Sequence, residues 1–505
     1  MNSSTRVIYN TGIQYVRNVV SVLVSLYVTR LILDALGVEN YGIYAVVGGV
    51  VAMLSFIQSS LSGTTQRYLS FHQGRDDISM QRSIFNNSVV TQLLISILLI
   101  VILVAIKPLL FRGILNIPAT RMEAAIWVYY CMLVSLFFTM QSTPYLATLI
   151  AHENILFATV VQLVDTLLKI PIALSLTWFS VDRLKLYAIL VVSVQALNYL
   201  LYYLYSKRKY PETTGVRLFS FKKRIFLDMF FFMGWTIYST GCIVGRTQGI
   251  AIVLNKFFGA AMNAAYGLSL TVSGQLSFLS TSLRNAINPQ IIKAEGAGDR
   301  NKMLRLSEIS SKFSFILMAI ITIPGIIEMR SLLSLWLKEV PDHAVMFCQF
   351  ILLSNLIDQL TSGLITANKA IGDIRSYSLI INTIKLLTVP VALICLYFGL
   401  PVVSVMIGYV FFEMVCAIAR LPFLHVTAGL SVDGFVSRVF LRLLTPTLLT
   451  ISICYAYSRL LNTSWSFLGT FGLSLCTMAG STFLFGLCVD EKRLISQFTE
   501  KIRKR

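Results

Sequence analysis

The sequence predicts an all-α integral membrane protein with about fourteen transmembrane helices, arranged as two six-helix lobes and two further C-terminal helices. Three observations carry this prediction: an apolar composition, a series of long apolar segments and an internal repeat. Of the 505 residues, 56% are hydrophobic and only 13% are charged, whereas soluble domains carry roughly 25% charged residues. So apolar a chain cannot cover its surface with polar groups and needs the bilayer as its solvent.

Long apolar segments follow one another along the chain, and each span needs roughly 20 apolar residues. We predict spans at 8–33, 41–62, 84–106, 124–148, 154–179, 184–205, 234–255, 260–283, 308–326, 344–366, 376–398, 402–424, 441–461 and 465–488. The opening residues MNSSTRVIYN lack a short apolar core followed by a cleavage site. We therefore expect no cleaved signal peptide.

Basic residues are concentrated between alternate spans. With both termini placed inside, the cytoplasmic segments and span edges hold 27 Lys and Arg, against nine on the external side. This bias is typical of inner-membrane proteins, favours an even number of spans and accounts for the net charge of +19 without a nucleic-acid partner. We expect a bacterial inner-membrane protein with both termini in the cytoplasm, and basic segments that lie against anionic membrane lipids.

The first half of the chain recurs in the second half. A shift of 222 residues places LGVENYGIYAVVGGVVAMLSFIQSSL on FGAAMNAAYGLSLTVSGQLSFLSTSL, and also pairs Gly74 with Gly296 and Asp77 with Asp299. A shift of 219 pairs PIALSLTWF from Pro171 with PVALICLYF from Pro390. Two matches in the same order at nearly the same offset indicate a duplication. Six spans per copy give a parallel repeat, with a pseudo-two-fold axis along the membrane normal.

This repeat predicts the domain organisation. We expect an N-lobe at 1–205, a basic cytoplasmic loop at 206–224, a C-lobe at 225–430, two extra spans within 431–488 and a basic tail at 489–505. Pro171 and Pro390 interrupt helices at equivalent positions. They are either bending points of a transport cycle or static kinks.

Four of the basic residues within predicted spans stand out as candidates: Arg17, Lys169, Arg246 and Lys385. Their spans are the first and fifth of each repeat. Ionisable groups within spans are costly, so they face a cavity or a partner, and inward cations suit an anionic, phosphate-bearing substrate. The alternative for Lys169 is neutralisation by Asp165, four residues earlier on the same helical face, and Arg17 could instead extend to the headgroups.

Three acids well inside predicted spans also stand out: Asp165, Asp358 and Glu413. A desolvated carboxylate can take up a proton or hold a sodium ion, and so couple transport to an ion gradient. The alternative is that these acids are structural partners of the cations, and it is slightly favoured because no spacing singles out an ion site. The sequence leaves both interpretations open.

Nothing in the sequence predicts an enzyme. The predicted external loops are too short for a catalytic domain, and no P-loop, H-E-x-x-H or G-x-S-x-G motif is present. The eight cysteines are spread singly without a C-x-x-C, and the four histidines are scattered, so we expect neither a metal site nor a cofactor.

The stretch NTGIQYVRNVVSVLVSLYVTRLILDALGVENYGIYAVVGGVVAMLSF, followed by TTQRYLSFHQGRDD, resembles the start of Wzx-type polysaccharide flippases of the multidrug/oligosaccharidyl-lipid/polysaccharide exporter superfamily. The pattern L-G-V-x-x-Y-G-I-Y is its most specific feature. The resemblance implies a flippase for polyprenyl-pyrophosphate-linked repeat units of O-antigen, capsule or exopolysaccharide. It assigns Arg17, Lys169, Arg246 and Lys385 to a cationic cavity. It also implies H⁺ or Na⁺ coupling, with a polysaccharide polymerase and other assembly proteins as partners.

Two other functions compete with this one. A multidrug or cation antiporter of the same superfamily would need a cavity dominated by acids and aromatic residues. An O-antigen polymerase would need larger external loops, and the duplication speaks against it.

Overall fold

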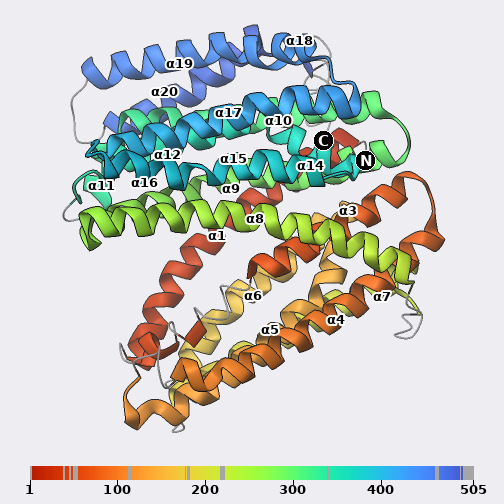
Figure 1. The fold of residues 1–505 in the computed structure, drawn as a ribbon. Coiled ribbons are helices and arrows are strands. Elements are labelled where there is room, and N and C mark those ends of the chain that lie inside the picture. Colours follow the sequence, from red (N-terminus) through yellow and green to blue (C-terminus); the bar gives the residue numbers. More distant parts are fainter. Residues whose placement is uncertain are drawn as a thin grey trace, which may run out of the picture. The chain divides into compact units, whose positions relative to one another are not determined.

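The computed structural model describes residues 3–37, 40–44, 47–48, 55–111, 117–176, 178, 182–215, 222–337, 340–460, 466–488 and 491–492. Within these ranges the chain is helical and contains no strand, which confirms the predicted all-α class. It forms two compact units (Figure 1): an N-unit of residues 10–237, and a C-unit of residues 238–505 together with 1–9. The predicted lobe boundaries lie near this division but remain a prediction.

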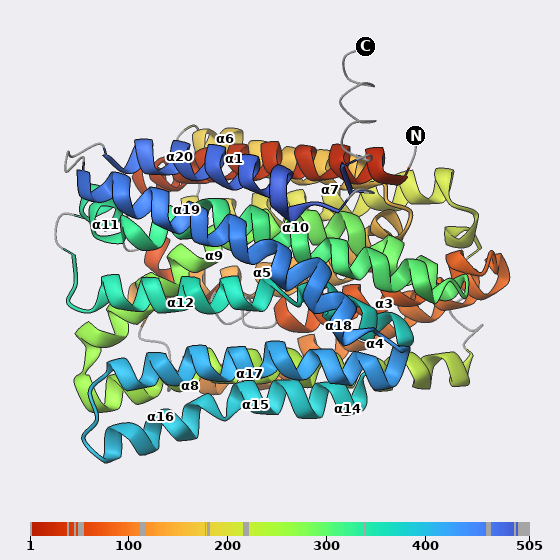
Figure 2. The same cartoon turned by 90° about the horizontal axis from the view of Figure 1, so that it is seen from above.

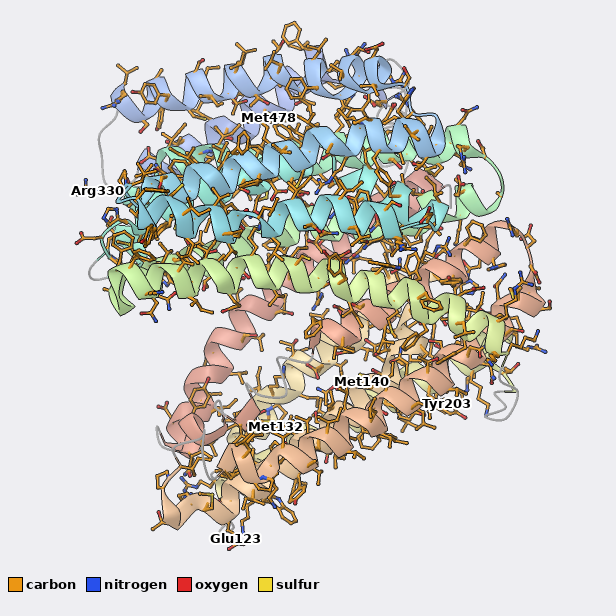
Figure 3. All side chains as sticks on the ribbon, viewed as in Figure 1. Glu123, Met132, Met140, Tyr203, Arg330 and Met478 are labelled. Atoms are coloured by element: carbon orange, nitrogen blue, oxygen red, sulfur yellow. The ribbon has the colours of Figure 1, made fainter. Side chains whose placement is uncertain are left out.

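The helices of the N-unit are α1 (Ser3–Leu36), α3 (Ser55–Gly74), α4 (Ile78–Leu109), α5 (Met122–Ala151), α6 (Ile155–Ser175), α7 (Arg183–Lys209) and the start of α8 (Lys223–Phe258), with the short turns η2 (Ala119–Arg121) and η3 (Pro211–Thr213). The parallel pair α5 and α7 is the most extensive packing in this unit. Lys185 binds Glu123 at 2.6 Å at one end of the pair, and Tyr145 packs edge-on against Tyr203 at the other. Figure 3 labels Glu123 and Tyr203 near these two ends.

The C-unit continues with α9 (Ala260–Gly296), α10 (Arg300–Ile327), α11 (Met329–Trp336), α12 (Ala344–Gln359), α13 (Ser362–Ile371), α14 (Arg375–Tyr377), η4 (Ser378–Asn382), α15 (Thr383–Leu386), α16 (Thr388–Tyr397) and α17 (Val403–Ala428). It ends with α18 (Val432–Phe435), η5 (Val436–Phe440), α19 (Leu441–Leu460), α20 (Ser466–Ser481) and η6 (Thr482–Gly486). Helix α10 packs against α9, α12, α13, α19 and α20, and 67% of its most apolar window is buried. The pair α19 and α20 therefore joins the unit through α10, as both views show (Figures 1 and 2).

The repeat is visible in the backbone. Gly37 and Gly259, one repeat apart, both adopt positive φ, 78° and 81°. Asp76 and Gly298 do the same at φ 53° and 80°. A left-handed residue costs little at glycine, so each copy turns its chain at the same two points.

Helix capping follows the same repeat. Asp77 accepts a hydrogen bond from the Met80 N–H at the start of α4, and Asp299 accepts one from the Lys302 N–H at the start of α10, both at 3.0 Å. Such caps satisfy N–H groups that have no partner within the helix. The Met80 bond, together with one from Ser79, lowers the pKa of Asp77 below its ordinary value.

Ten helices of the described ranges are long and apolar enough to cross a membrane, or eleven if the bent pair α12–α13 is one span. The predicted number of fourteen therefore remains a prediction. Helices α1, α3 and α9 do not meet this criterion, and polar residues are frequent in them. The predicted tenth span, 344–366, bends by 47° between α12 and α13.

Candidate functional site

A buried charge cluster lies among α8, α15 and α17 of the C-unit. Arg246 on α8 donates to Glu413 Oε2 on α17 at 2.8 Å. Lys385 Nζ on α15 lies 2.6 Å from Glu413 Oε1. The side chains of all three are at most 8% exposed. Glu413 therefore holds two cations at once, from two different helices.

The cluster extends to α12 through Asp358. Lys385 Nζ donates to Asp358 Oδ1 at 3.1 Å, and Arg420 Nη2 on α17 donates to the same oxygen at 2.8 Å. Arg420 Nη1 also donates to Thr361 Oγ1 at 3.0 Å. Arg420 is 1% exposed and Asp358 is 23% exposed, so the carboxylate is the most accessible member. We call Arg246, Asp358, Lys385, Glu413 and Arg420 the C-unit cluster.

Helix α17 supplies two members because of its own periodicity. Glu413 and Arg420 are seven residues apart and share one face, two turns from one another. Tyr409, one turn before Glu413, places its ring 4.1 Å from the Arg246 guanidinium. A cation over an aromatic face is stabilised by the ring quadrupole.

Basic groups outnumber acidic groups in this region. The C-unit cluster itself has three cations and two carboxylates. Arg284 on α9 donates to Gln359 Oε1 at 3.4 Å and to Thr281 Oγ1 at 3.1 Å, and its charge acts on Asp358, Arg420 and Lys369. Arg246, Lys385, Arg420 and Arg284 against Asp358 and Glu413 leave a formal surplus of two positive charges. In a low-dielectric interior such a surplus attracts an anion.

A smaller polar centre lies in the N-unit. Asp165 on α6 pairs with Lys169 Nζ at 3.2 Å and accepts hydrogen bonds from Gln195 at 3.3 Å and Asn198 at 2.8 Å on α7. Arg17 on α1 is half-buried, and its charge acts on Asp165. Arg17 Nε is buried and makes no hydrogen bond to any residue that the structure describes.

Corresponding helices build both centres. The first, fifth and sixth predicted spans carry Arg17, the Asp165–Lys169 pair and Gln195 in the N-unit. In the second copy the same spans carry Arg246, Lys385 and Glu413. The duplication therefore produces a polar centre of the same construction in each unit, although the individual charges differ.

The predicted site residues fall into two sets. Arg246, Lys385, Asp358 and Glu413 converge in the C-unit, whereas Arg17, Lys169 and Asp165 meet in the N-unit. Each of the three acids has a basic partner within 3.2 Å. Such pairing is one of the two interpretations that the sequence left open for these acids and for Lys169. The prolines also differ: Pro171 lies within α6, while Pro390 lies in the first turn of α16, just after α15 ends.

Four basic residues were not predicted as site candidates: Arg420, Arg284, Lys369 and Lys312. Lys312 lies on α10 and pairs with Glu491 at 2.9 Å. Arg420 lies inside the predicted span 402–424, and its seven-residue spacing from Glu413 is a usable signal. Arg284 and Lys369 directly follow predicted spans, where a cation ordinarily reaches the headgroups. Only the packing of α9 and α13 brings them close to α12.

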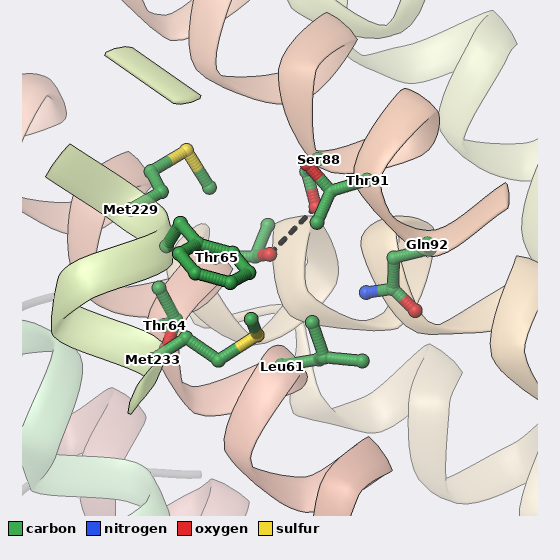
Figure 4. A pocket seen from close by; sticks show the side chains of 9 residues that line it. Leu61, Thr64, Thr65, Ser88, Thr91, Gln92, Met229 and Met233 are labelled. Atoms are coloured by element: carbon green, nitrogen blue, oxygen red, sulfur yellow. Dashed lines mark hydrogen bonds between the residues drawn. The ribbon is translucent and has the colours of Figure 1, made fainter. Parts of the chain in front are cut away.

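A small polar pocket in the N-unit lies between α3, α4 and the start of α8 (Figure 4). Thr65 and Ser88 share a 2.6 Å hydrogen bond across it, and Met229 and Met233 cover it from α8. Gln92 is fully buried beside this pocket, and neither atom of its amide has a partner among the described residues.

No family model matches the sequence, and no curated protein matches it either. Solved structures do match the fold. The crystal structure of MATE in complex with MaD3S aligns with 16% identity and a TM-score of 0.71 over 86% of this chain and 97% of that chain. An outward-facing multidrug resistance MATE family transporter of the MOP superfamily aligns over the same shares, with 15% identity and a TM-score of 0.68.

A third match is a MOP superfamily transporter from Pyrococcus furiosus, described as having a binding pocket of reverse polarity that suggests a different function. It aligns with 15% identity and a TM-score of 0.71 over 86% of this chain and 97% of that chain. Similarity at this level of identity establishes architecture and leaves substrate open. The protein has the fold of the solved MATE transporters.

Proposed function

We propose that the protein is a membrane transporter that moves an amphipathic anion across the bilayer by alternating access. The substrate class is a polyprenyl-pyrophosphate-linked oligosaccharide used for surface polysaccharide. The observation that carries this proposal is the surplus of basic side chains around the C-unit cluster, where four cations accompany two carboxylates.

The chemistry of these side chains suits a pyrophosphate. Guanidinium groups bind phosphate oxygens in pairs, while an ammonium group acts as a point charge. Arg284, whose described partners are only the neutral oxygens of Gln359 and Thr281, keeps its charge available to an anion. In the N-unit, Arg17 likewise keeps its charge available to an anion, because its buried Nε has no hydrogen-bond partner among the described residues.

Multidrug or cation transport is the second candidate, and similarity to the solved MATE structures favours it. A cavity for cationic drugs needs carboxylates that are free to face the drug. Here Asp165, Asp358 and Glu413 already bind lysine or arginine side chains. The Pyrococcus furiosus transporter, with its binding pocket of reverse polarity, supports using the charge of the pocket rather than the fold to choose between the two candidates.

Coupling to H⁺ or Na⁺ is part of the proposal, and Asp358 is its best candidate because it is the most exposed acid of the C-unit cluster. A bacterial inner-membrane location with both termini inside, and a polysaccharide polymerase and other assembly proteins as partners, complete the proposal. No catalytic role is assigned to any residue.

Deletion of the gene in its host tests the proposal. We expect single lipid-linked repeat units to accumulate on the cytoplasmic face, and surface polysaccharide to return with the wild-type gene but not with Arg284→Ala at equal membrane levels. Arg284→Lys, which keeps the charge, is the matched control. Repeat units that reach the outer face without being polymerised would favour a polymerase. Unchanged polysaccharide with altered drug sensitivity would favour multidrug transport.

A further inference from the structure

An apolar groove of about 350 Å³ lies beside the C-unit cluster, among α12, α17 and the α18–η5 segment. Its first wall is Met414, Ala417, Ile418 and Leu421, which follow one stripe of α17. Its lining is almost entirely apolar, with the hydroxyl of Thr361 as the exception. The volume lies within the range of small-molecule sites, about 300–1,000 Å³.

The groove and the charge cluster occupy adjacent stripes of the same helices. On α17, Glu413 and Arg420 face the cluster, while Met414 and Leu421, the next residue in each case, line the groove. Successive residues of a helix point about 100° apart. One helix therefore presents a charged stripe and an apolar stripe side by side.

The second wall of the groove, at the end of α12, has the same side-by-side arrangement of charged and apolar residues. Asp358 belongs to the cluster, whereas the preceding Ile357 and the following Leu360 line the groove. Thr361 connects the two sites, because it lines the groove and accepts a hydrogen bond from Arg420 Nη1 at 3.0 Å. The apolar groove thus begins one hydrogen bond away from a buried guanidinium.

The third wall is Phe435, Val436, Val439 and Phe440 at the turn η5, where the helix widens into a π-helical turn. Such turns often occur at functional sites. The walls from α17 and η5 belong to segments that are long and apolar enough to cross a membrane, and α12 meets this criterion together with α13 as a bent pair. Ile418 and Phe440 on the rim are 60% and 47% exposed, so the groove is open at its side.

We infer that this groove binds one hydrocarbon chain of an anionic lipid whose phosphate group pairs with the cations of the C-unit cluster. The inference rests on the proposed function and adds a binding site for the lipid portion of the substrate. A neutral lipid would gain only the apolar contact. An anionic lipid gains both contacts, because Arg420 of the C-unit cluster binds Thr361 at the edge of the groove.

Photolabelling of the purified full-length protein tests this site. The probe is a polyprenyl phosphate with a diazirine on its chain, and its control is the polyprenol with the same diazirine and no phosphate. We expect the phosphate probe to label peptides that contain residues 414–421 and 435–440, and to label them more strongly than the alcohol. Equal labelling by the two probes would overturn the inference.

Two variants fill the groove with a large side chain, one from the α17 wall and one from the η5 wall, and a third variant on α17 serves as their control. Ala417→Trp and Val436→Trp should each abolish this labelling, whereas Val426→Trp should not, since Val426 is an 83% exposed position of the same helix. Thermal unfolding of each variant identifies any that fails to fold, and two independent filling variants keep the test decisive. Labelling that persists in both folded variants would contradict the assignment.

Labelling reports binding and does not require transport, so two failures can be told apart. If the phosphate probe labels the groove more strongly than the alcohol but lipid-linked oligosaccharide is not moved, the proposed function is wrong and the lipid site is supported. If the oligosaccharide is moved but the groove peptides stay unlabelled, the site falls and the function stands.

Discussion

Lys385 Nζ lies 2.6 Å from Glu413 Oε1 in the interior of the C-unit, with exposed fractions of 8% and 2% for the two side chains. Lys385 also binds Asp358, and Glu413 also binds Arg246. Each side chain therefore has two partners of opposite charge. Removing one member leaves the others desolvated and without full compensation.

Glu413→Gln should lower stability strongly, because it leaves Arg246 without its carboxylate and leaves Lys385 with Asp358 alone. Breaking a buried ion pair from one side costs about 3–5 kcal/mol. The double variant Arg246→Met with Glu413→Gln should recover part of that loss. Thermal unfolding of the detergent-solubilised protein measures both. A Glu413→Gln variant that unfolds at the wild-type temperature would contradict this account of the cluster.

Arg17→Ala should abolish transport with little effect on stability. Arg17 Nε has no hydrogen-bond partner among the described residues, so its removal leaves no acceptor unpaired. Lys169→Ala should have a weaker effect on transport, because the Lys169 charge is already balanced by Asp165 at 3.2 Å. Arg17→Lys is the control that keeps the charge. Equal transport by Arg17→Ala and wild type would remove Arg17 from the site.

Gly363→Ala should destabilise the C-unit. A Cβ atom at Gly363 would lie 2.1 Å from the backbone oxygen of Ser307, so α13 would have to move away from α10. Overpacking of this kind typically costs about 1–3 kcal/mol. Gly408→Ala on α17 is the matched control, because a Cβ there meets nothing within 4 Å. Unchanged unfolding of Gly363→Ala would show that α10 and α13 are less closely packed than the geometry indicates.

Two buried glutamines of the N-unit should respond in opposite ways to replacement by leucine. Gln92 has no hydrogen-bond partner among the described residues, whereas Gln141 donates to Ser96 Oγ at 3.1 Å. Gln92→Leu should leave the unfolding temperature unchanged or raise it, because an unsatisfied buried amide is removed. Gln141→Leu should lower it, because the Ser96 hydroxyl loses a partner, at a cost of about 1–3 kcal/mol. The reverse order would indicate that Gln92 is satisfied by another group.

The sequence was sufficient for the helical class and for the internal repeat. The paired positions Gly37 and Gly259 recur as left-handed residues, and Asp77 and Asp299 recur as helix caps. Such features depend on local backbone preferences, which are carried by individual residues. The bend between α12 and α13 could not be predicted, because residues 344–366 read as one continuous apolar segment.

The charged site was predicted only in part. Arg246, Lys385, Asp358 and Glu413 were found because a charge within an apolar segment is conspicuous. Their pairing could not be derived, since it depends on how α8, α12, α15 and α17 rotate against each other. Arg284 could not be predicted for a related reason: it lies just beyond a predicted span, and tertiary packing alone brings it to Gln359, next to Asp358.

The charge of the substrate is the central claim, and reconstitution into proteoliposomes tests it most directly. The measurement compares two substrates in one preparation: a fluorescent polyprenyl-pyrophosphate-linked oligosaccharide, followed by its accessibility in the outer leaflet, and a cationic dye, followed by efflux. The surplus of basic groups predicts that the lipid-linked anion is moved, that Arg284→Ala abolishes this movement, and that the dye is not transported. Transport of the cationic dye, with no movement of the lipid-linked anion, would contradict the account and assign the protein to multidrug transport.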